Sequence, residues 1–482
     1  MPVDAFGNYV EYRETLAAQR AQLERMSPDA LFEHAVYGVG VFEVCRAELM
    51  SRLIGLSPQW RNQPLPDSRR KLFTEILEIN YAELIDNMAA ACLWIEFWHL
   101  TTKATPRLAY VGVFSGSLTY ARALLEIMRF HPGRCFVLES FFTGAHFYCE
   151  ERYSPIANQS DLKLKTVFRS IGKPEDMAVF ESKRNAVRDV LKKIKNKNVT
   201  QPQATGARLF HNEQPTLLIA GQVLNDFSLL ETLDCGINSL ETYRQVIRKV
   251  LAETDWNVIY KAHPWERKKH NLFQPLTLNE LSAEFGQEAR VALVEDHALT
   301  DLFKEADAVL CLNSQAGIEA ALAGFKPIQL GRAFWGGHGF SHDVGHKILD
   351  DVLQTLSNPA NCRLDLAAYE QLENWLVAVL DGWMIEESPG AKADARLKML
   401  FAEIATRAPD MTIHPAGKAS ISDKSKAKTI ATANPAASEQ PRSRIFQRKL
   451  RKLINRPADF FRDAGNGVVR RIGLFVFSKA GS

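Results

Sequence analysis

The sequence that decides the fold spans residues 299–331 and reads LTDLFKEADAVLCLNSQAGIEAALAGFKPIQLG. Its apolar pattern predicts a buried strand over residues 308–312, followed by a polar turn at Asn313 and Ser314. A helix is expected to begin at Ser314 and to lead into a second strand over residues 327–330. Strand, helix and strand in this order are typical of an α/β protein with a parallel sheet.

The turn at Asn313 and Ser314 has the features of a ligand site. In an open α/β sheet, ligands bind outside the carboxyl ends of the strands. A helix that begins there directs free N–H groups toward the ligand, which suits a phosphate. Glu319 lies just over one turn inside the expected helix, where its carboxylate could accept hydrogen bonds from sugar hydroxyls. The stretch therefore predicts one half of a nucleotide-sugar site.

The composition is that of a soluble enzyme. The chain has 482 residues, of which 46% are hydrophobic and 24% are charged, so it is long enough for two or three domains with full-sized cores. No run approaches the roughly 20 apolar residues that cross a bilayer. Residues 1–12 are polar and acidic, and they lack the features of a signal peptide. We therefore expect a cytoplasmic protein.

The cysteines predict neither a disulfide framework nor a metal site. Their number is odd, they are widely spread, and none has Cys-x-x-Cys spacing. Such cysteines are typical of reduced thiols in a cytosolic protein, so no metal is expected. The seven are Cys45, Cys92, Cys135, Cys149, Cys235, Cys311 and Cys362.

The net charge of +3 conceals an asymmetry between the body of the chain and its tail. Residues 442–482 hold eleven Lys or Arg residues and two Asp residues, whereas the rest holds 48 basic and 54 acidic residues. A mildly acidic body argues against nucleic-acid binding. The tail mixes basic with apolar residues, as segments on anionic membrane surfaces do. A solubilised tail or a partner-docking helix is the alternative.

The chain divides into five segments. Residues 1–105 are predicted to be helical, residues 106–205 to form an N-terminal Rossmann-like domain with a connector, and residues 206–407 to form a C-terminal Rossmann-like domain. Residues 408–441 are rich in Ala, Ser, Thr, Lys and Pro and are predicted to be a disordered linker. The basic amphipathic tail, residues 442–482, follows. The predicted fold class is α/β, with two Rossmann-like domains facing a cleft.

Short alternating strands and helices support this division. In the N-terminal domain we expect strands over residues 108–114 and 135–138 in a parallel sheet, with a helix over residues 118–130 between them. An irregular, aromatic-rich and functional loop is expected over residues 140–172, and a basic connector helix with a solvated face over residues 183–197. In the C-terminal domain the strands are expected at residues 216–220, 256–260, 291–294, 308–312 and 327–330, and helices at residues 239–251, 366–379 and 393–407.

Further polar residues stand where strands are expected to end. In the sequence YKAHP, His263 is able to hydrogen-bond or protonate a phosphate oxygen, Lys261 supplies positive charge, and Pro264 fixes the backbone. A lone histidine is more often structural, so both interpretations stay open at this point.

The segment GQVLNDFS, residues 221–228, follows another expected strand. Its residues Gln222, Asp226 and Ser228 are candidates for ligand contact. Asp226 and Ser228 are equally suited to a helix cap or a turn. This segment alone therefore decides nothing about function.

Two groups in the N-terminal domain complete the candidate site. Glu139 follows the second expected strand, where a carboxylate would face the cleft as general base or nucleophile. An N-cap or an ion pair is the alternative for this residue. Ser115 and Gly116 form a strand-to-helix turn that could hold acceptor or phosphate oxygens.

These motifs together resemble a known family. GQVxxDxS, KxHP, NSxxGxEA with GxxP, and FWGGHGFSHD occur in this order between residues 139 and 343. They look like the capsular polysaccharide biosynthesis proteins of bacteria, a family that includes Kdo transferases. The resemblance implies a GT-B fold, a CMP-activated sugar donor, no cofactor and no metal. The family's usual Glu-x-Gly-Phe or Tyr pattern is ESFFT here, and residues 1–105 have no counterpart.

The resemblance also implies roles for individual residues. Glu139 would be the catalytic carboxylate, acting with His263. The resemblance assigns donor binding to Gln222, Asp226, Ser228, Lys261, Pro264, Asn313, Ser314, Glu319 and His338. It assigns the acceptor side to Ser115, Gly116, Tyr148, Glu151 and Arg152.

The resulting hypothesis is a glycosyltransferase that moves a sugar, Kdo as the best guess, from a CMP-activated donor. The acceptor would be a capsule or lipopolysaccharide glycan at the cytoplasmic membrane face, reached through the basic tail. One alternative is a CDP-polyol phosphotransferase of the same fold. Another is a non-catalytic capsule assembly or export factor. No nucleic-acid partner is expected.

Overall fold

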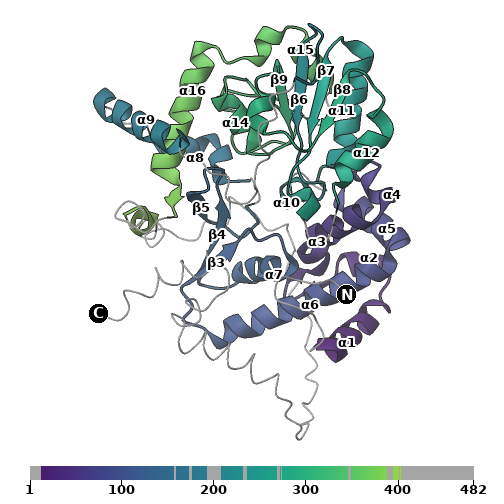
Figure 1. Cartoon of the computed structure of the whole chain (residues 1–482). Helices are drawn as coiled ribbons and strands as arrows, with labels where there is room; N and C mark the ends of the chain where they lie inside the picture. Colours follow the sequence, from purple (N-terminus) through teal and green to yellow (C-terminus); the bar gives the residue numbers. More distant parts are fainter. Residues whose placement is uncertain are drawn as a thin grey trace, which may run out of the picture. The chain divides into compact units, whose positions relative to one another are not determined.

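The computed structural model describes residues 12–402, apart from residues 157–158, 173–175, 193–207, 232–235, 269–271, 273, 346–348, 388–394 and 401. The expected linker at residues 408–441 and the basic tail at residues 442–482 therefore lie outside the described residues. Described residues 12–387 belong to one compact unit, which contains two sheets and a helical N-terminal part (Figure 1). The expected α/β class is confirmed.

The larger sheet is entirely parallel and has six strands in the order β11-β10-β9-β6-β7-β8. Counted along this domain, the order is 6-5-4-1-2-3, which is the doubly wound order of dinucleotide-binding folds. The order reverses between β6 and β9, so the switch point lies between them. The strands are β6 (Thr216–Ala220), β7 (Asn257–Lys261), β8 (Val291–Val294), β9 (Ala308–Cys311), β10 (Ile328–Gln329) and β11 (His342–Asp343).

Helices flank this sheet (Figure 1), and some of them begin at a side-chain cap. The Asn238 side chain accepts a hydrogen bond from the Glu241 N–H at the start of α11, and Asp365 caps α16 through the Ala368 N–H. Such caps satisfy N–H groups that the helix leaves open. The helices are α10 (Phe227–Leu230), α11 (Ser239–Glu253), α12 (Leu276–Phe285), α13 (Leu299–Leu302), α14 (Ala316–Leu322), α15 (Leu349–Leu356) and α16 (Leu366–Val377).

The smaller sheet has four strands in the order β12-β5-β4-β3, and only β3 and β4 are parallel. The expectation of a parallel N-terminal sheet was therefore wrong for half of it. The helix α7 (Thr119–Met128) makes the crossover between the two parallel strands. The strands are β3 (Tyr110–Phe114), β4 (Arg134–Ser140), β5 (His146–Glu151) and β12 (Ile385–Glu386).

Residues 140–172 are not the irregular loop that their composition predicted. The chain turns at Gly144, where φ is +65°, and β5 returns antiparallel to β4. The hairpin forms because β5 buries Tyr148, Cys149 and Glu150 on its way back. A 3-10 turn (Asp161–Lys163) and the helix α8 (Lys165–Ser170) follow within the same stretch.

The N-terminal part is helical, as expected, with one two-stranded hairpin. Helices α3 and α6 are apolar on almost all sides, because each contacts several neighbouring helices. The elements are α1 (Arg13–Leu23), α2 (Pro28–Phe32), β1 (Ala35–Val36), β2 (Val39–Gly40), α3 (Val41–Leu56), α4 (Pro58–Arg61), α5 (Arg69–Ile79) and α6 (Tyr81–Ala104).

The last helices return the chain to the smaller sheet. After α16 the helix widens to a π-helical turn (Ala378–Trp383), and β12 then pairs with β5. The connector helix α9 (Met177–Lys192) packs on α16, where Arg184 and Arg188 both pair with Glu373. Its charged face is thus only partly solvated.

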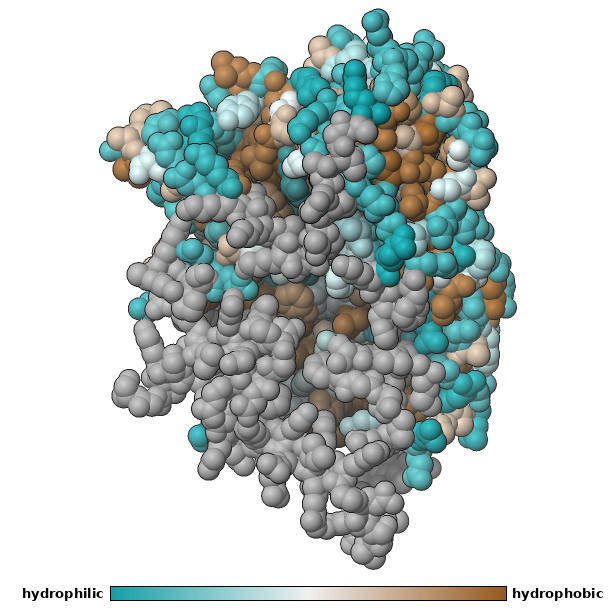
Figure 2. Space-filling model, viewed as in Figure 1, coloured by the Kyte–Doolittle hydropathy of each residue, from teal (hydrophilic) through white to brown (hydrophobic). Residues whose placement is uncertain are grey.

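Buried clusters cross the boundaries between these parts. One joins the N-terminal helices to the six-stranded sheet, and another joins the two sheet domains. No helix among the described residues is long and apolar enough to span a membrane. Figure 2 shows hydrophilic residues over much of the described surface on this side, with apolar residues among them.

Candidate functional site at the edges of the two sheets

The candidate donor residues stand at the switch point of the six-stranded sheet. Gln222 follows β6, Asn313 and Ser314 follow β9, and His263 follows β7. Because β6 lies between β7 and β9, His263 and Ser314 share one sheet edge and are separated by about 10 Å, two strand spacings. That these two residues meet the same anion stays a prediction.

Gln222, Ser228 and Asn313 form a closed hydrogen-bond network. The Gln222 amide nitrogen donates to Ser228 Oγ at 2.7 Å and to Asn313 Oδ1 at 2.8 Å. Ser228 Oγ donates to Asn313 Oδ1 at 2.9 Å, and Asn313 Nδ2 donates to the Ser228 carbonyl at 2.9 Å. All three side chains are buried. They therefore fix the loops after β6 and β9 against each other.

Asp226 lies in the same loop and caps a helix. Its side chain accepts a hydrogen bond from the Ser228 N–H at 2.8 Å, at the start of α10. This is the capping alternative that the sequence left open. The charge of Asp226 also reaches Glu139, where it contributes to a raised pKa.

Lys261 is committed to the backbone at the ends of β7 and β8. Its Nζ donates to the carbonyls of Ala262 at 2.8 Å and Glu295 at 2.9 Å, and burial lowers the pKa of its ammonium group to about 8. His263 is only half-buried, and its Nδ1 accepts the Trp265 N–H at 3.1 Å across Pro264. Lys261 therefore positions the turn that presents His263.

Glu319 is a partly buried carboxylate with no side-chain hydrogen bond among the described residues. It lies in α14, which begins at Ala316 and not at Ser314, because the Ser314 hydroxyl accepts the Ala316 N–H at 3.2 Å. Burial alone raises the pKa of Glu319 to about 7. Such a carboxylate is suited to a ligand that supplies hydroxyl groups.

Glu139 is the corresponding group at the carboxyl end of the smaller sheet. It does not follow the strand as expected but lies inside β4, which extends to Ser140, opposite Tyr148 of β5. Burial raises the pKa of this carboxyl to about 7, against the opposing effects of the Ser140 N–H and the Ser115 hydroxyl, which hydrogen-bond to it. Asp226 raises the pKa further, so the carboxylates of the two domains interact. A carboxyl that titrates near neutral pH is suited to proton transfer.

The turn that holds Glu139 is strained. Ser115 has a φ of 59° and Gly116 a φ of 87°. The left-handed region costs a non-glycine residue on the order of 1 kcal/mol. A Cβ at Gly116 would lie 2.5 Å from Leu125 Cδ1, so this position requires glycine. Strain of this kind concentrates at functional sites.

The three other expected acceptor residues are engaged inside the protein. Tyr148 is fully buried, with its ring edge-on to Phe141 and Phe334. Glu151 pairs with Arg134 at 3.0 Å. Arg152 donates to Glu150 at 3.0 Å and to the Gln159 carbonyl at 2.9 Å. The geometry gives these residues structural contacts beside Glu139.

Sequence reasoning missed Glu150, which joins three distant segments. Its carboxylate accepts hydrogen bonds from the Ser160 hydroxyl at 2.5 Å, the Asp161 N–H at 3.0 Å and the Trp383 indole at 2.9 Å. Burial raises the pKa of this carboxyl. Nothing in the sequence links residue 150 to residue 383, so no local signal could have found this network.

His338 lies among aromatic rings and away from the switch point. Its ring centroid is 4.5 Å from that of Phe168 and 6.1 Å from that of Trp375, and burial lowers its pKa to about 4. The surrounding motif is held by Asp343, which accepts hydrogen bonds from Gln329 and from the Gly337 N–H. FWGGHGFSHD therefore builds the junction between the two sheet domains.

Helix α3 connects the edges of both sheets. Glu48 accepts the Thr119 N–H at 2.7 Å, beside the strained turn after β3. One turn further on, Ser51 Oγ donates to the Asn225 carbonyl at 3.2 Å, and Asn225 Nδ2 donates back to the Ser51 carbonyl at 2.7 Å. The N-terminal helices thus position Glu139 and Asp226 relative to each other.

The described residues were searched for clusters that could hold a metal ion and for paired cysteines. No cluster of three or more His, Cys, Asp or Glu side chains suited to a metal ion occurs in the described part of the chain. Six cysteines are described, and all of them are free and buried. The expectation that activity needs no metal stays a prediction.

The fold and the site together define the class of protein. A doubly wound parallel sheet, a second sheet and carboxylates at both edges make it an α/β protein of the GT-B-like class. The family of the capsule polysaccharide biosynthesis protein matches residues 171–367. The resemblance that the motifs indicated is therefore confirmed, and mainly the C-terminal sheet domain carries it.

The chain is also similar to individual known proteins. The capsule polysaccharide export protein KpsS of Escherichia coli is 30% identical over 155 residues, which are 31% of this chain and 38% of that protein. Two solved Thermosulfurimonas dismutans KpsC structures, a beta Kdo 2,4 transferase and a beta Kdo 2,7 transferase, are 17% and 15% identical. They cover 56% and 63% of this chain and 78% and 89% of their own, with TM-scores of 0.38 and 0.37. Scores of this size do not support a functional conclusion.

Proposed function

We propose that this protein is a glycosyltransferase that moves a sugar from a CMP-activated donor onto a capsule or lipopolysaccharide acceptor. The carrying observation is the buried Glu139 carboxyl, whose pKa is raised to about 7 mainly by burial and further by the nearby charge of Asp226 from the other sheet domain. A titratable carboxyl directed at a nucleotide-type switch point is the arrangement that group transfer requires. The family match supports the choice of glycan substrates.

The donor would lie at the edge of the six-stranded sheet. His263 and the turn at Ser314 would neutralise the departing phosphate, which is worth a few kcal/mol per preorganised donor. Glu319 would accept hydrogen bonds from the ribose. The buried network of Gln222, Ser228 and Asn313 would hold both loops in place.

Glu139 would act on the acceptor. With a pKa of about 7 it is protonated in about half of the molecules near neutral pH, so it can both take and return a proton. Ser115 and the Ser140 N–H would orient it toward the reacting atoms. Kdo remains the proposed sugar, and the basic tail would bring the protein to the inner membrane.

Turnover of the purified chain tests this proposal. We expect CMP release from a CMP-sugar in the presence of a glycolipid acceptor, reduced at least 100-fold in His263→Ala because a phosphate contact is lost. Arg248→Ala, an exposed position on α11, is the matched control. Near-normal turnover of His263→Ala would remove this mechanism. Release of CMP from CDP-glycerol instead would favour the polyol phosphotransferase.

A second candidate is a capsule assembly or export factor without catalysis. It is favoured by the relative named as an export protein and by the internal pairing of Gln222, Ser228 and Asn313. Thermal-shift titration with CMP, CDP, UDP and GDP separates the candidates. Stabilisation by cytidine nucleotides alone supports the transferase, and no response to any nucleotide supports the export factor.

A further inference from the structure

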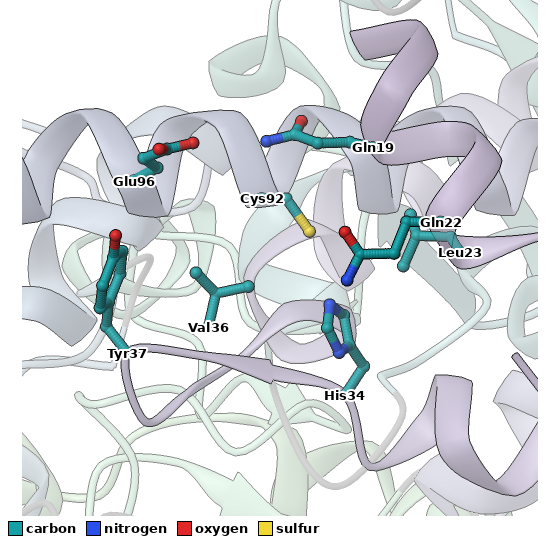
Figure 3. Close-up of a pocket in the computed structure, with 8 residues that line it drawn as sticks. All are labelled: Gln19, Gln22, Leu23, His34, Val36, Tyr37, Cys92 and Glu96. Atoms are coloured by element: carbon teal, nitrogen blue, oxygen red, sulfur yellow. The ribbon is translucent and has the colours of Figure 1, made fainter. Parts of the chain in front are cut away.

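A cavity of about 210 Å³ lies in the N-terminal part, away from both sheet edges (Figure 3). It lies between α1, the β1–β2 hairpin and α6 and is partly open to solvent. Gln19 and Gln22 reach it from α1, His34 and Tyr37 from the hairpin, and Cys92 and Glu96 from α6. At about 30 Å³ for each water, the volume equals roughly seven water molecules. That is room for one sugar ring and too little for a nucleotide.

The lining is polar and almost uncharged. Burial lowers the pKa of His34, which keeps the imidazole neutral, and raises the pKa of the Cys92 thiol to about 12. Among the described residues that line the cavity, Glu96 is the single carboxylate and none is Lys or Arg. Gln19 Oε1 is buried and has no hydrogen-bonding partner in the described part of the chain. An orphaned amide oxygen calls for a donor such as a ligand hydroxyl.

The rim of the cavity is strained at an aromatic residue. Tyr37 occupies the hairpin turn with a φ of 50°, before Gly38 at 80°. Turns of this type prefer Asn, Asp or Gly at the first position, so a bulky tyrosine there costs stability. The Tyr37 ring is stacked on the His99 ring at 3.7 Å, yet 48% of the residue stays exposed. The fold therefore maintains a costly, exposed aromatic ring beside an unsatisfied polar cavity.

We propose that this cavity binds one neutral sugar unit, with Tyr37 against the apolar face of the ring and Gln19, Gln22 and Glu96 on its hydroxyls. Aromatic side chains combine apolar contact with low loss of conformational freedom. The described lining offers one carboxylate and no Lys or Arg, which disfavours phosphate and sugar acids such as Kdo. The site is thus separate from the proposed donor site, and its occupant is a neutral unit of a glycan or the corresponding free sugar.

Saturation-transfer NMR and calorimetry on the full chain test this site. The probes are neutral hexoses and N-acetylhexosamines, with glucuronic acid and CMP as contrasts. We expect neutral sugars to bind with a Kd on the order of 1 mM. Tyr37→Ala and Glu96→Gln should weaken this binding at least 5-fold each. A neutral oligosaccharide that binds tighter than its monosaccharide identifies a glycan chain as the source, and equal affinities identify the free sugar.

Matched controls are Tyr81→Ala, an exposed tyrosine at the start of α6, and Glu83→Gln, in the first turn of the same helix. Both should retain the affinity of the wild type. The proposal is overturned by absence of binding of every neutral sugar, by equal binding of glucuronic acid, or by unchanged affinity in both cavity variants. None of these results depends on CMP binding or on turnover, so the site and the proposed transferase activity can fail separately.

Discussion

The two sheets differ in how the polar side chains at their carboxyl ends are stabilised. At the six-stranded sheet, Gln222 and Asn313 are satisfied by each other, and Lys261 is satisfied by two backbone carbonyls. At the four-stranded sheet, Glu139 is buried beside a strained turn, accepts hydrogen bonds from Ser115 and the Ser140 N–H, and has a pKa raised to about 7. Most side chains of the motif-rich edge other than Glu319 thus form a scaffold, whereas at the other edge the carboxyl itself is suited to proton transfer.

This difference distinguishes motif residues that stabilise the fold from motif residues that act in catalysis. The side chains of one motif, such as Gln222 and Asn313, can be needed because they hold each other in place, and replacing one of them then lowers the stability of the fold. A buried carboxyl such as Glu139 lowers the stability of the fold, and replacing it lowers activity instead. The following predictions test that separation.

The largest effect is expected for Glu139→Gln. The amide cannot transfer a proton, so turnover should fall about 1,000-fold, which equals about 4 kcal/mol of transition-state stabilisation. Binding of the nucleotide, measured by calorimetry, should change less than 2-fold. Glu253→Gln, an exposed position at the end of α11, is the control. Turnover within 10-fold of the wild type would contradict a catalytic role for Glu139.

Asn313→Ala should show the opposite behaviour. It leaves the Ser228 carbonyl without its buried partner and removes the acceptor that the Gln222 amide and the Ser228 hydroxyl share, so we expect a loss of about 3 kcal/mol in the free energy of unfolding. Urea unfolding measures this loss. An exposed variant such as Asn361→Ala is the comparison. A stability equal to that of the wild type would mean that the network is not a scaffold.

The C-terminal sheet could be predicted from the sequence because its central strands β6, β7 and β9 are buried on both faces. Continuous apolar runs mark β6 and β8 at their observed bounds, and β9 is shorter than expected by one residue. β5 was missed because its residues HFYCEE include two carboxylates, one buried and one ion-paired. Such a strand has no apolar alternation, since its polar groups are satisfied by residues far away in the chain.

The site was predictable only in part, for the same reason. Four residues lie at or just after the ends of expected strands, and this was enough to place them at the carboxyl ends of the sheets, because sheet geometry alone dictates that placement. They are Glu139, Gln222, His263 and Asn313. Whether each side chain is free or paired depends on contacts over 80 or more residues, such as Gln222 with Asn313. No local pattern encodes those contacts.

The pH dependence of stability should sharpen the contrast. Glu139 has a pKa of about 7 in the folded protein and an ordinary value of 4.5. The folded state therefore binds more protons than the unfolded chain between these values, and its stability falls as the pH rises through this window. Between about pH 5 and pH 7.5 we expect the wild type to lose on the order of 2 kcal/mol more than Glu139→Gln. Parallel unfolding curves for the two proteins would contradict the raised pKa.

The smallest effect is expected for Ser51→Ala on α3. It removes the hydrogen bond to the Asn225 carbonyl but keeps the return bond from Asn225, so we expect a loss of about 1 kcal/mol in the free energy of unfolding. Because Asp226 is the next residue, turnover should also fall about 3-fold. Ser68→Ala, which removes only the cap of α5, should lower stability similarly without changing turnover. Equal turnover in both variants would show that α3 does not position the donor loop.

The pairing of β12 with β5 has a consequence for biosynthesis. The N-terminal sheet is completed by residues 385–386, more than 230 positions after β5 ends. At about 5–20 residues per second, a ribosome needs roughly 12–50 s to reach them. During that interval the edge of β5 lacks this partner, and open strand edges are sites of aberrant pairing. A message truncated before codon 378 would therefore yield a nascent chain that cannot close its first sheet.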